Sequence, residues 1–132
     1  MNVTFHWKMR FSDDAIPYAI SDALSNDGLD FIGCLFSDSG GAKYDDPVYV
    51  ELLEGGIYGI ELVKKGGVKY FDWCLSYWGA EFEENMARVY SLCDENFFIN
   101  VKLDDFEKVL IDWKKFVSKG PLDNNAKDTL DA

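Results

Sequence analysis

The first eleven residues of the chain alternate between polar and apolar side chains with a strict period of two. The apolar set, which defines one face, is Val3, Phe5, Trp7, Met9 and Phe11. Successive side chains of a β-strand point to opposite faces, so this pattern is typical of a strand with one buried and one solvated face. The chain is therefore expected to contain a sheet with one covered face, and Trp7 is expected in the core.

The rest of the chain mixes helical and strand patterns. Apolar residues at helical spacing predict helices over residues 14–24, 82–93 and 104–119. The last of these has the most complete pattern, with a capping-box-like pair of Asp104 and Glu107 and a stop at Gly120-Pro121. With Gly55-Gly56 interpreted as a hairpin turn, strands are expected over residues 29–36, 48–54, 57–63, 68–75 and 97–103.

This order of elements predicts an α+β fold. We expect a mostly antiparallel sheet of five to six strands with about three helices packed on it. The 132 residues are enough for one domain, which we assign to residues 1–120. Residues 121–132 are polar and unpatterned, so they are expected to form a flexible C-terminal tail.

The negative charge of the chain is concentrated in one segment. Residues 11–63 contain eleven carboxylates and one basic residue, Lys43, and account for nearly all of the net charge of −11. Such a segment repels nucleic acid and anionic membranes, and it attracts cations and basic proteins. A basic protein is therefore the expected partner, and neither nucleic acid nor a membrane is expected to bind directly.

The sequence favours a cytoplasmic location. Its three cysteines are odd in number, lie far apart and form no CxxC pair, so they are expected to be reduced. The N-terminus lacks the apolar block of a signal peptide, and no stretch approaches the length of a membrane span.

Groups with an assignable catalytic role are few. His6 is the only histidine and falls on the polar face of the first strand, where a surface role is expected. Residues 37–41 (SDSGG) resemble the box around the serine of chymotrypsin-like proteases, but the first glycine is replaced and the chain is too short for that fold. The acidic loop with Asp38, Asp45 and Asp46 does not follow EF-hand spacing. We therefore expect no catalytic residue, no cofactor and no metal site.

Aromatic residues accompany the carboxylates in the middle of the chain. Tyrosine and tryptophan beside charged groups are typical of protein-interface hot spots. Segment 37–61 combines both features on what is predicted to be a loop and its adjoining strands. The predicted partner-binding residues are Asp38, Tyr44, Asp45, Asp46, Tyr49, Glu51, Glu54 and Glu61.

In these properties the chain resembles the immunity proteins of bacterial toxin systems, including those that neutralise contact-dependent growth-inhibition toxins and nuclease bacteriocins. The resemblance is one of overall character over residues 1–120 and includes no signature motif. It implies a cytoplasmic protein that is not an enzyme and that binds one cognate basic toxin domain, often a nuclease. Its carboxylates would replace the substrate phosphates or cover the cleft that binds them.

Two other classes of function remain open from the sequence. A nucleic-acid mimic would block a DNA-binding protein, and it requires carboxylates in regular rows at roughly phosphate spacing. A small ligand-binding domain or enzyme would use an apolar pocket with His6 or a carboxylate of shifted pKa.

Overall fold

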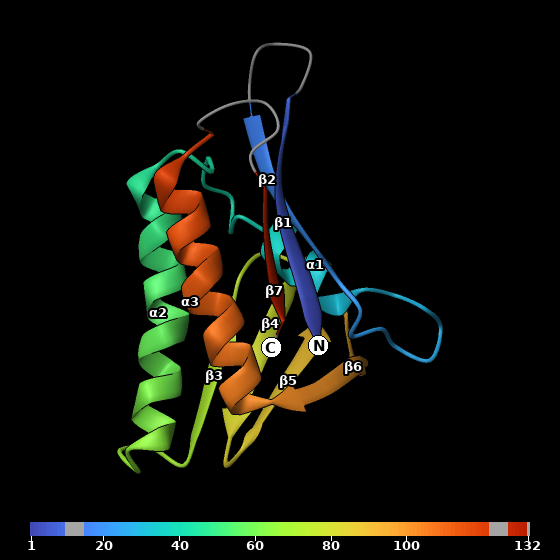
Figure 1. The fold of residues 1–132 in the computed structure, drawn as a ribbon. Helices are drawn as coiled ribbons and strands as arrows, with labels where there is room; N and C mark the ends of the chain where they lie inside the picture. Colours follow the sequence, from blue (N-terminus) through green and yellow to red (C-terminus); the bar gives the residue numbers. More distant parts are fainter. Residues whose placement is uncertain (10–14, 122–126, 132) are drawn as a thin grey trace.

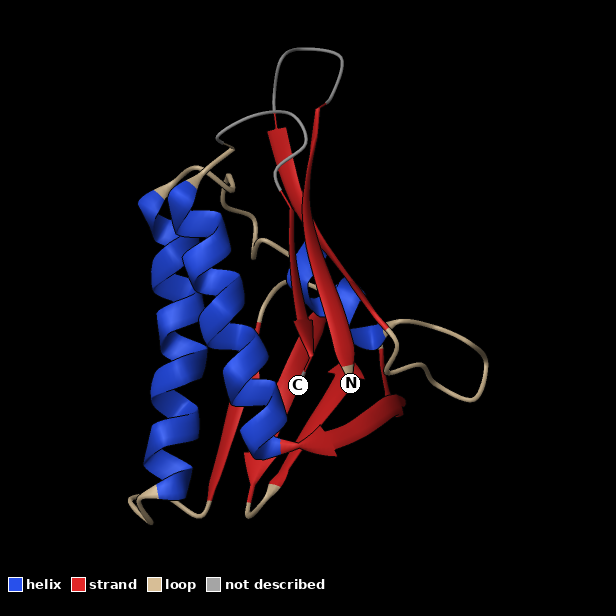
Figure 2. Cartoon of the chain, in the orientation of Figure 1, coloured by secondary structure: helices blue, strands red, loops and turns tan. Residues whose placement is uncertain are grey.

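The computed structural model describes residues 1–9, 15–121 and 127–131. Over these residues it contains three helices and seven strands, and the strands form two antiparallel sheets (Figures 1 and 2). The predicted α+β class is confirmed. The strands are divided between a three-stranded and a four-stranded sheet.

The three-stranded sheet has the order β2-β1-β7 and contains both ends of the described chain. β1 (Asn2–Met9) is the predicted first strand, and its Val3, Phe5 and Trp7 side chains are buried. Phe11 lies outside the described residues. The predicted helix over 14–24 is wrong, because β2 (Ala15–Ser21) pairs with β1 along its whole length. β2 is an edge strand, where Pro17 is tolerated because no further strand needs its N–H.

The C-terminal segment also differs from the expectation of a flexible tail. Residues 127–131 form β7 (Lys127–Asp131), which pairs with the other side of β1. Residues 122–126 of the expected tail lie outside the described residues.

The four-stranded sheet is a meander in the order β3-β4-β5-β6. Its strands are β3 (Tyr70–Cys74), β4 (Trp78–Glu83), β5 (Met86–Ser91) and β6 (Asp94–Lys102). The expected strands near β3 and β6 are confirmed. The expected helix over 82–93 is wrong, because a tight turn at Glu84, with a φ of 52°, folds this segment into the β4–β5 hairpin.

The first two helices replace three expected strands. α1 (Phe31–Ser37) begins at Asp30, whose side chain accepts a hydrogen bond from the Gly33 N–H. α2 (Pro47–Lys64) begins in the same way at Asp46 and runs through the expected turn at Gly55-Gly56. The strands predicted over 29–36, 48–54 and 57–63 are therefore wrong.

Glycines in α2 allow it to lie close to the four-stranded sheet. A Cβ at Gly56 would lie 2.8 Å from the Trp73 ring, and one at Gly59 would lie 2.2 Å from the Phe71 ring. These glycines therefore accommodate aromatic side chains of β3, and the close packing offsets the low helix propensity of glycine.

The predicted last helix is confirmed as α3 (Leu103–Lys119), which packs beside α2 (Figure 1). Gly120, with a φ of 70°, follows its end. The expected capping box is wrong, because the N-cap is Lys102. Asp104 and Glu107 instead form ion pairs with Lys64 of α2, at 2.7 and 2.9 Å.

The core lies between the helices and the inner faces of the two sheets. Trp113 of α3 is fully buried and packs edge-on against Phe5 of β1 at 5.3 Å between ring centroids. It also stacks on Phe36 of α1, while Phe106 of α3 contacts Phe82 of β4. One aromatic cluster thus connects the helices with both sheets. The outward faces of α2 and of the four-stranded sheet lie outside this cluster.

Candidate functional site

Five of the eight predicted partner-binding residues line one groove. This groove, which we call the acidic groove, has a volume of about 450 Å³ and lies between the loop before α2, the first turns of α2 and the end of α3. Val50, Pro47 and Val117 supply apolar surface, and Ser118 lies at the end of α3. The predicted residues that line it are Tyr44, Asp45, Asp46, Glu51 and Glu54.

Local interactions fix the shape of the groove. The Tyr44 hydroxyl donates a hydrogen bond to the Ser37 carbonyl oxygen at 2.5 Å, and its ring packs edge-on against Tyr49. Asp46 caps α2 through the Val48 N–H at 3.0 Å. Because these contacts hold the loop before a partner arrives, binding there would require little ordering of the chain.

The exposed face of α2 continues the acidic surface beyond the groove. Glu51, Glu54, Tyr58 and Glu61 are exposed, and their spacing of three and four residues places them along one side of the helix. Tyr58 is 59% exposed and lies between the glutamates. This face therefore combines carboxylates with an aromatic ring, as expected for an interface that binds cations.

The charge of this region is only partly neutralised. Lys114 of α3 forms an ion pair with Glu54 at 3.2 Å, and both side chains are substantially exposed. Asp45 and Glu51 are exposed as well. An exposed ion pair contributes little stability, so a partner's arginine or lysine could replace Lys114 at small cost.

Two predicted contact residues have structural roles instead. Asp38 is only 8% exposed, and its carboxylate accepts hydrogen bonds from the backbone N–H groups of Tyr77 at 2.7 Å and Trp78 at 3.0 Å. Tyr49 is fully buried; its hydroxyl accepts from Trp113 Nε1 at 2.9 Å and donates to the Phe36 carbonyl oxygen. Burial raises the pKa of Tyr49, and the hydrogen bond with Trp113 opposes part of this rise. The expectation that Asp38 and Tyr49 contact a partner is therefore corrected.

The carboxylates of α2 are unevenly spaced. Steps of three and seven residues separate Glu51, Glu54 and Glu61, which correspond to about 4.5 and 10 Å along a helix. A regular row at phosphate spacing, which a nucleic-acid mimic requires, is not formed by these three side chains. The geometry of α2 thus gives no support to a nucleic-acid mimic.

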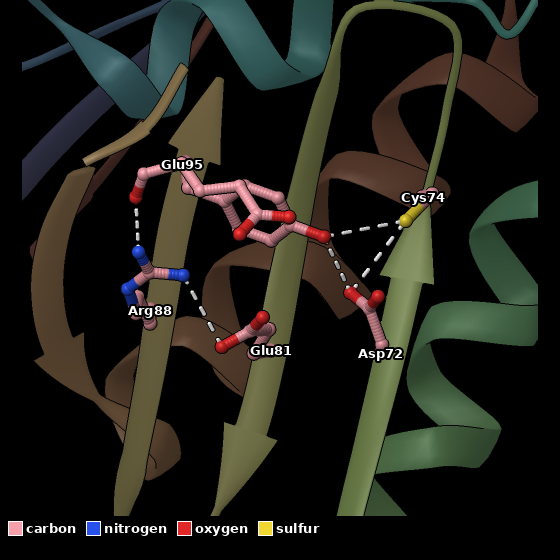
Figure 3. A network of polar contacts seen from close by, with 6 residues as sticks. Asp72, Cys74, Glu81, Arg88 and Glu95 are labelled. Atoms are coloured by element: carbon pink, nitrogen blue, oxygen red, sulfur yellow. Dashed lines mark hydrogen bonds and ion pairs between the residues drawn. The ribbon is translucent and has the colours of Figure 1, made fainter. Parts of the chain in front are cut away.

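A second exposed surface was not predicted from the sequence. The strands β3 to β6 turn one face toward the helices and the other toward solvent, and Figure 3 shows side chains of this outer face with helices behind the strands. Asp72 lies opposite Glu81, and Glu81 lies opposite Arg88, on neighbouring strands. A helix over 82–93, as expected from the sequence, would not place these residues side by side. They come together only through the pairing register of the strands, which the sequence pattern does not specify.

Polar contacts organise this outer face (Figure 3). Arg88 forms an ion pair with Glu81 at 3.2 Å, donates to the Glu95 carbonyl oxygen, and lies over the Phe98 ring at 4.2 Å. The Tyr90 hydroxyl donates to Asp72 at 2.7 Å. Gly79 leaves room for the Tyr90 ring, because a Cβ there would lie 3.0 Å from it.

Cys74 completes the network and is held as a neutral thiol. Its Sγ lies 3.5 Å from an Asp72 oxygen and 3.4 Å from the Tyr90 hydroxyl. Burial raises the pKa of Cys74, and the Asp72 charge adds to the rise, whereas the hydrogen bond with Tyr90 opposes it. Burial likewise raises the pKa of Tyr90. A raised pKa makes a thiol a poor nucleophile, so this network is suited to holding the strands together.

Neither the hollow beside α1 nor His6 points to a defined chemistry. A hollow of about 440 Å³ beside α1 is lined by Cys34, Asp30 and Asp38. Both carboxylates accept hydrogen bonds, and burial followed by the Asp30 charge raises the pKa of Cys34. His6 stacks on Tyr18 on the outer side of the three-stranded sheet. Within the described ranges, no three His, Cys, Asp or Glu side chains converge as a possible metal site.

Comparisons with protein-family models, with curated proteins and with solved structures find no match to this chain. Among the helices of the described residues, none combines the length and apolar composition needed to cross a membrane.

Proposed function

We propose that this protein is a cytoplasmic inhibitor of the immunity-protein type, which binds a basic bacterial toxin domain, with a nuclease as the favoured class. The acidic groove and the exposed face of α2 would form the contact surface. The observation that carries this proposal is the convergence of Asp45, Asp46, Glu51 and Glu54 with Tyr44 in one groove that is already held in shape.

The physical basis of inhibition is charge complementarity. A basic active-site cleft attracts an acidic surface, which accelerates association, and buried aromatic anchors then slow dissociation. Tyr58 and the apolar floor of the groove, with Val50 and Val117, are suited to this second role. The stems of lysine and arginine side chains can pack on such apolar surface while their charged ends meet the carboxylates.

The test uses the product of the neighbouring gene as the candidate binding partner. We expect a complex of one chain with one partner that forms faster at low salt and that suppresses the partner's toxic activity. The variant Glu51→Lys, which leaves the Asp46 helix cap intact, should slow association and weaken inhibition roughly tenfold.

The matched control is Asp27→Lys, which makes the same charge change in the exposed loop between β2 and α1. That loop lies on the side of the molecule away from α2 (Figure 1). Equal losses in the two variants would show that only the overall charge matters and would remove the groove from the proposal. Undiminished toxic activity in the presence of excess wild-type protein would overturn the proposed function itself.

A further inference from the structure

The outer face of the four-stranded sheet is a regular grid of side chains. Its three rows follow from the antiparallel register, and each row takes one residue from each strand. The helices pack on the opposite face, through contacts such as Gly56 with Trp73 and Phe82 with Phe106. We call this grid the outer sheet face; in the order β3, β4, β5, β6 its rows are Cys74, Gly79, Tyr90, Phe98; Asp72, Glu81, Arg88, Asn100; and Tyr70, Glu83, Met86, Lys102.

Charge is divided across the outer sheet face along a line between its two central strands. The β3–β4 half contains the acids Asp72, Glu81 and Glu83, and the β5–β6 half contains the bases Arg88 and Lys102. Large apolar side chains are exposed on both halves: Tyr70 is 45% exposed, and Met86 and Phe98 are each 41% exposed. Such a mixture of exposed apolar and charged groups is typical of an interaction surface.

We propose that the outer sheet face is a self-association surface that binds a second copy of this chain. A two-fold axis that lies in the contact plane, parallel to the strands and between β4 and β5, places β3 over the partner copy's β6 and β4 over its β5. In the central row, Glu81 then faces Arg88 of the second copy, and the symmetry repeats this pair. In the outer row, the Tyr70 ring faces a second-copy lysine, Lys102.

The side chains of the central row are already in place for this contact. Arg88 is held by its ion pair with Glu81 and by the rings of Tyr90 and Phe98 beneath its guanidinium group. Asp72, held by the Tyr90 hydroxyl, comes to face Asn100, an amide that can donate a hydrogen bond to it. The acid on one half thus meets a cation or a donor from the other half.

The association should be weak. Strands about 4.8 Å apart with a rise of about 3.3 Å per residue give a face of roughly 300–400 Å² per copy, below the roughly 800 Å² of a standard interface. The most acidic segment of the chain forms β2, α1 and α2, of which α1 and α2 lie on the other side of this sheet. Physiological salt should screen much of its repulsion.

Sedimentation at physiological salt, from about 10 μM to about 1 mM, tests the proposal in the concentration range suited to a small interface. Wild-type protein should shift from monomer to dimer. Glu81→Arg and Arg88→Glu should each associate at least roughly tenfold more weakly, because each places like charges opposite each other. An equimolar mixture of the two variants should form a heterodimer, because each restores the opposite charge that the other lacks.

Two control pairs separate the interface from folding and from overall charge. Glu51→Arg makes the same charge change as Glu81→Arg, but on α2, and should leave dimer formation intact. Asn100→Asp places a carboxylate opposite Asp72 of the second copy and should weaken the dimer, whereas Asn26→Asp in an exposed loop should not. The proposal is overturned by a wild-type monomer at every concentration, by single variants that dimerise like wild type, or by a mixture of the two charge variants that fails to associate.

Discussion

Removal of the Asp38 carboxylate should destabilise the fold by about 3 kcal/mol. In Asp38→Ala, the backbone N–H groups of Gly40, Ser76, Tyr77 and Trp78 lose their acceptor. A hydrogen bond to a charged group contributes about 1.5–3 kcal/mol. All four bonds are only partly buried, so water can replace part of the lost interaction, and we count only about two of the four bonds as lost, at the lower value.

The size of this effect makes it easy to measure. A loss of about 3 kcal/mol is a large share of the roughly 5–15 kcal/mol that stabilises a domain. It should lower the Tm by roughly 10 °C and move the urea midpoint without changing the slope of the transition. Tryptophan fluorescence can follow unfolding, because Trp78 lies at the site of the change and Trp113 lies in the core.

The exposed neighbour Asp45 provides the control. Asp45→Ala should change the free energy of unfolding by less than about 0.5 kcal/mol, because that side chain is exposed. Asp38→Asn should give an intermediate loss, since its amide oxygen can still accept. A loss below about 1 kcal/mol for Asp38→Ala would refute the structural role assigned to this carboxylate.

Three further changes test the packing around α2. Tyr49→Phe should cost about 1–2 kcal/mol in urea unfolding, because the buried Trp113 Nε1 loses its acceptor; a value near zero would contradict the buried hydrogen bond. Gly59→Ala should lower the free energy of unfolding by about 1–3 kcal/mol, because the new Cβ overlaps the Phe71 ring. In the control Gly55→Ala the new Cβ meets open space, so this change should be neutral or stabilising. Equal effects of the two substitutions would contradict the close approach of α2 to β3. Burial raises the pKa of Tyr49 above its ordinary value of 10.0, so the stability it contributes is fully present below pH 10 and is lost as the pH rises above it. Urea midpoints of the wild type should therefore fall from about pH 10 upward, and Tyr49→Phe should flatten this fall; identical pH profiles would rule out Tyr49 as the source.

Local pattern alone was sufficient for β1 and α3. The alternation of Val3, Phe5 and Trp7 and the apolar stripe through Trp113 each specify one period and one buried face. Both elements are long and amphipathic, so their tertiary environment agrees with their local preference. The α+β class followed from these and from the short strands near β3 and β6.

The middle of the chain depended on contacts far apart in sequence. Gly55-Gly56 has the composition of a hairpin turn, yet in α2 the second glycine accommodates Trp73 of β3. Residues 15–21 have apolar side chains at helical spacing, yet pairing with β1 makes them a strand. In both cases a partner element that the local sequence does not specify determined the outcome.

Prediction of the candidate site was limited in the same way, because it also depends on contacts between residues far apart in the sequence. The acidic segment was visible as charge, and Asp45, Glu51 and Glu54 do lie on an exposed surface. The internal roles of Asp38 and Tyr49 could not be read from composition, because each depends on partners at least thirteen residues away, such as Phe36 and Trp78. The outer sheet face can be predicted only when the pairing register of β3 to β6 is known.

Site-specific photo-cross-linking tests the proposed binding surface most directly. A photoreactive phenylalanine analogue at Tyr58, 59% exposed on α2, should cross-link to the proposed basic partner. The same analogue at Leu24, 53% exposed in the loop between β2 and α1, should give little cross-linked product. Cross-linking from position 24 and none from position 58 would contradict the assignment of α2 and the acidic groove as the inhibitory surface.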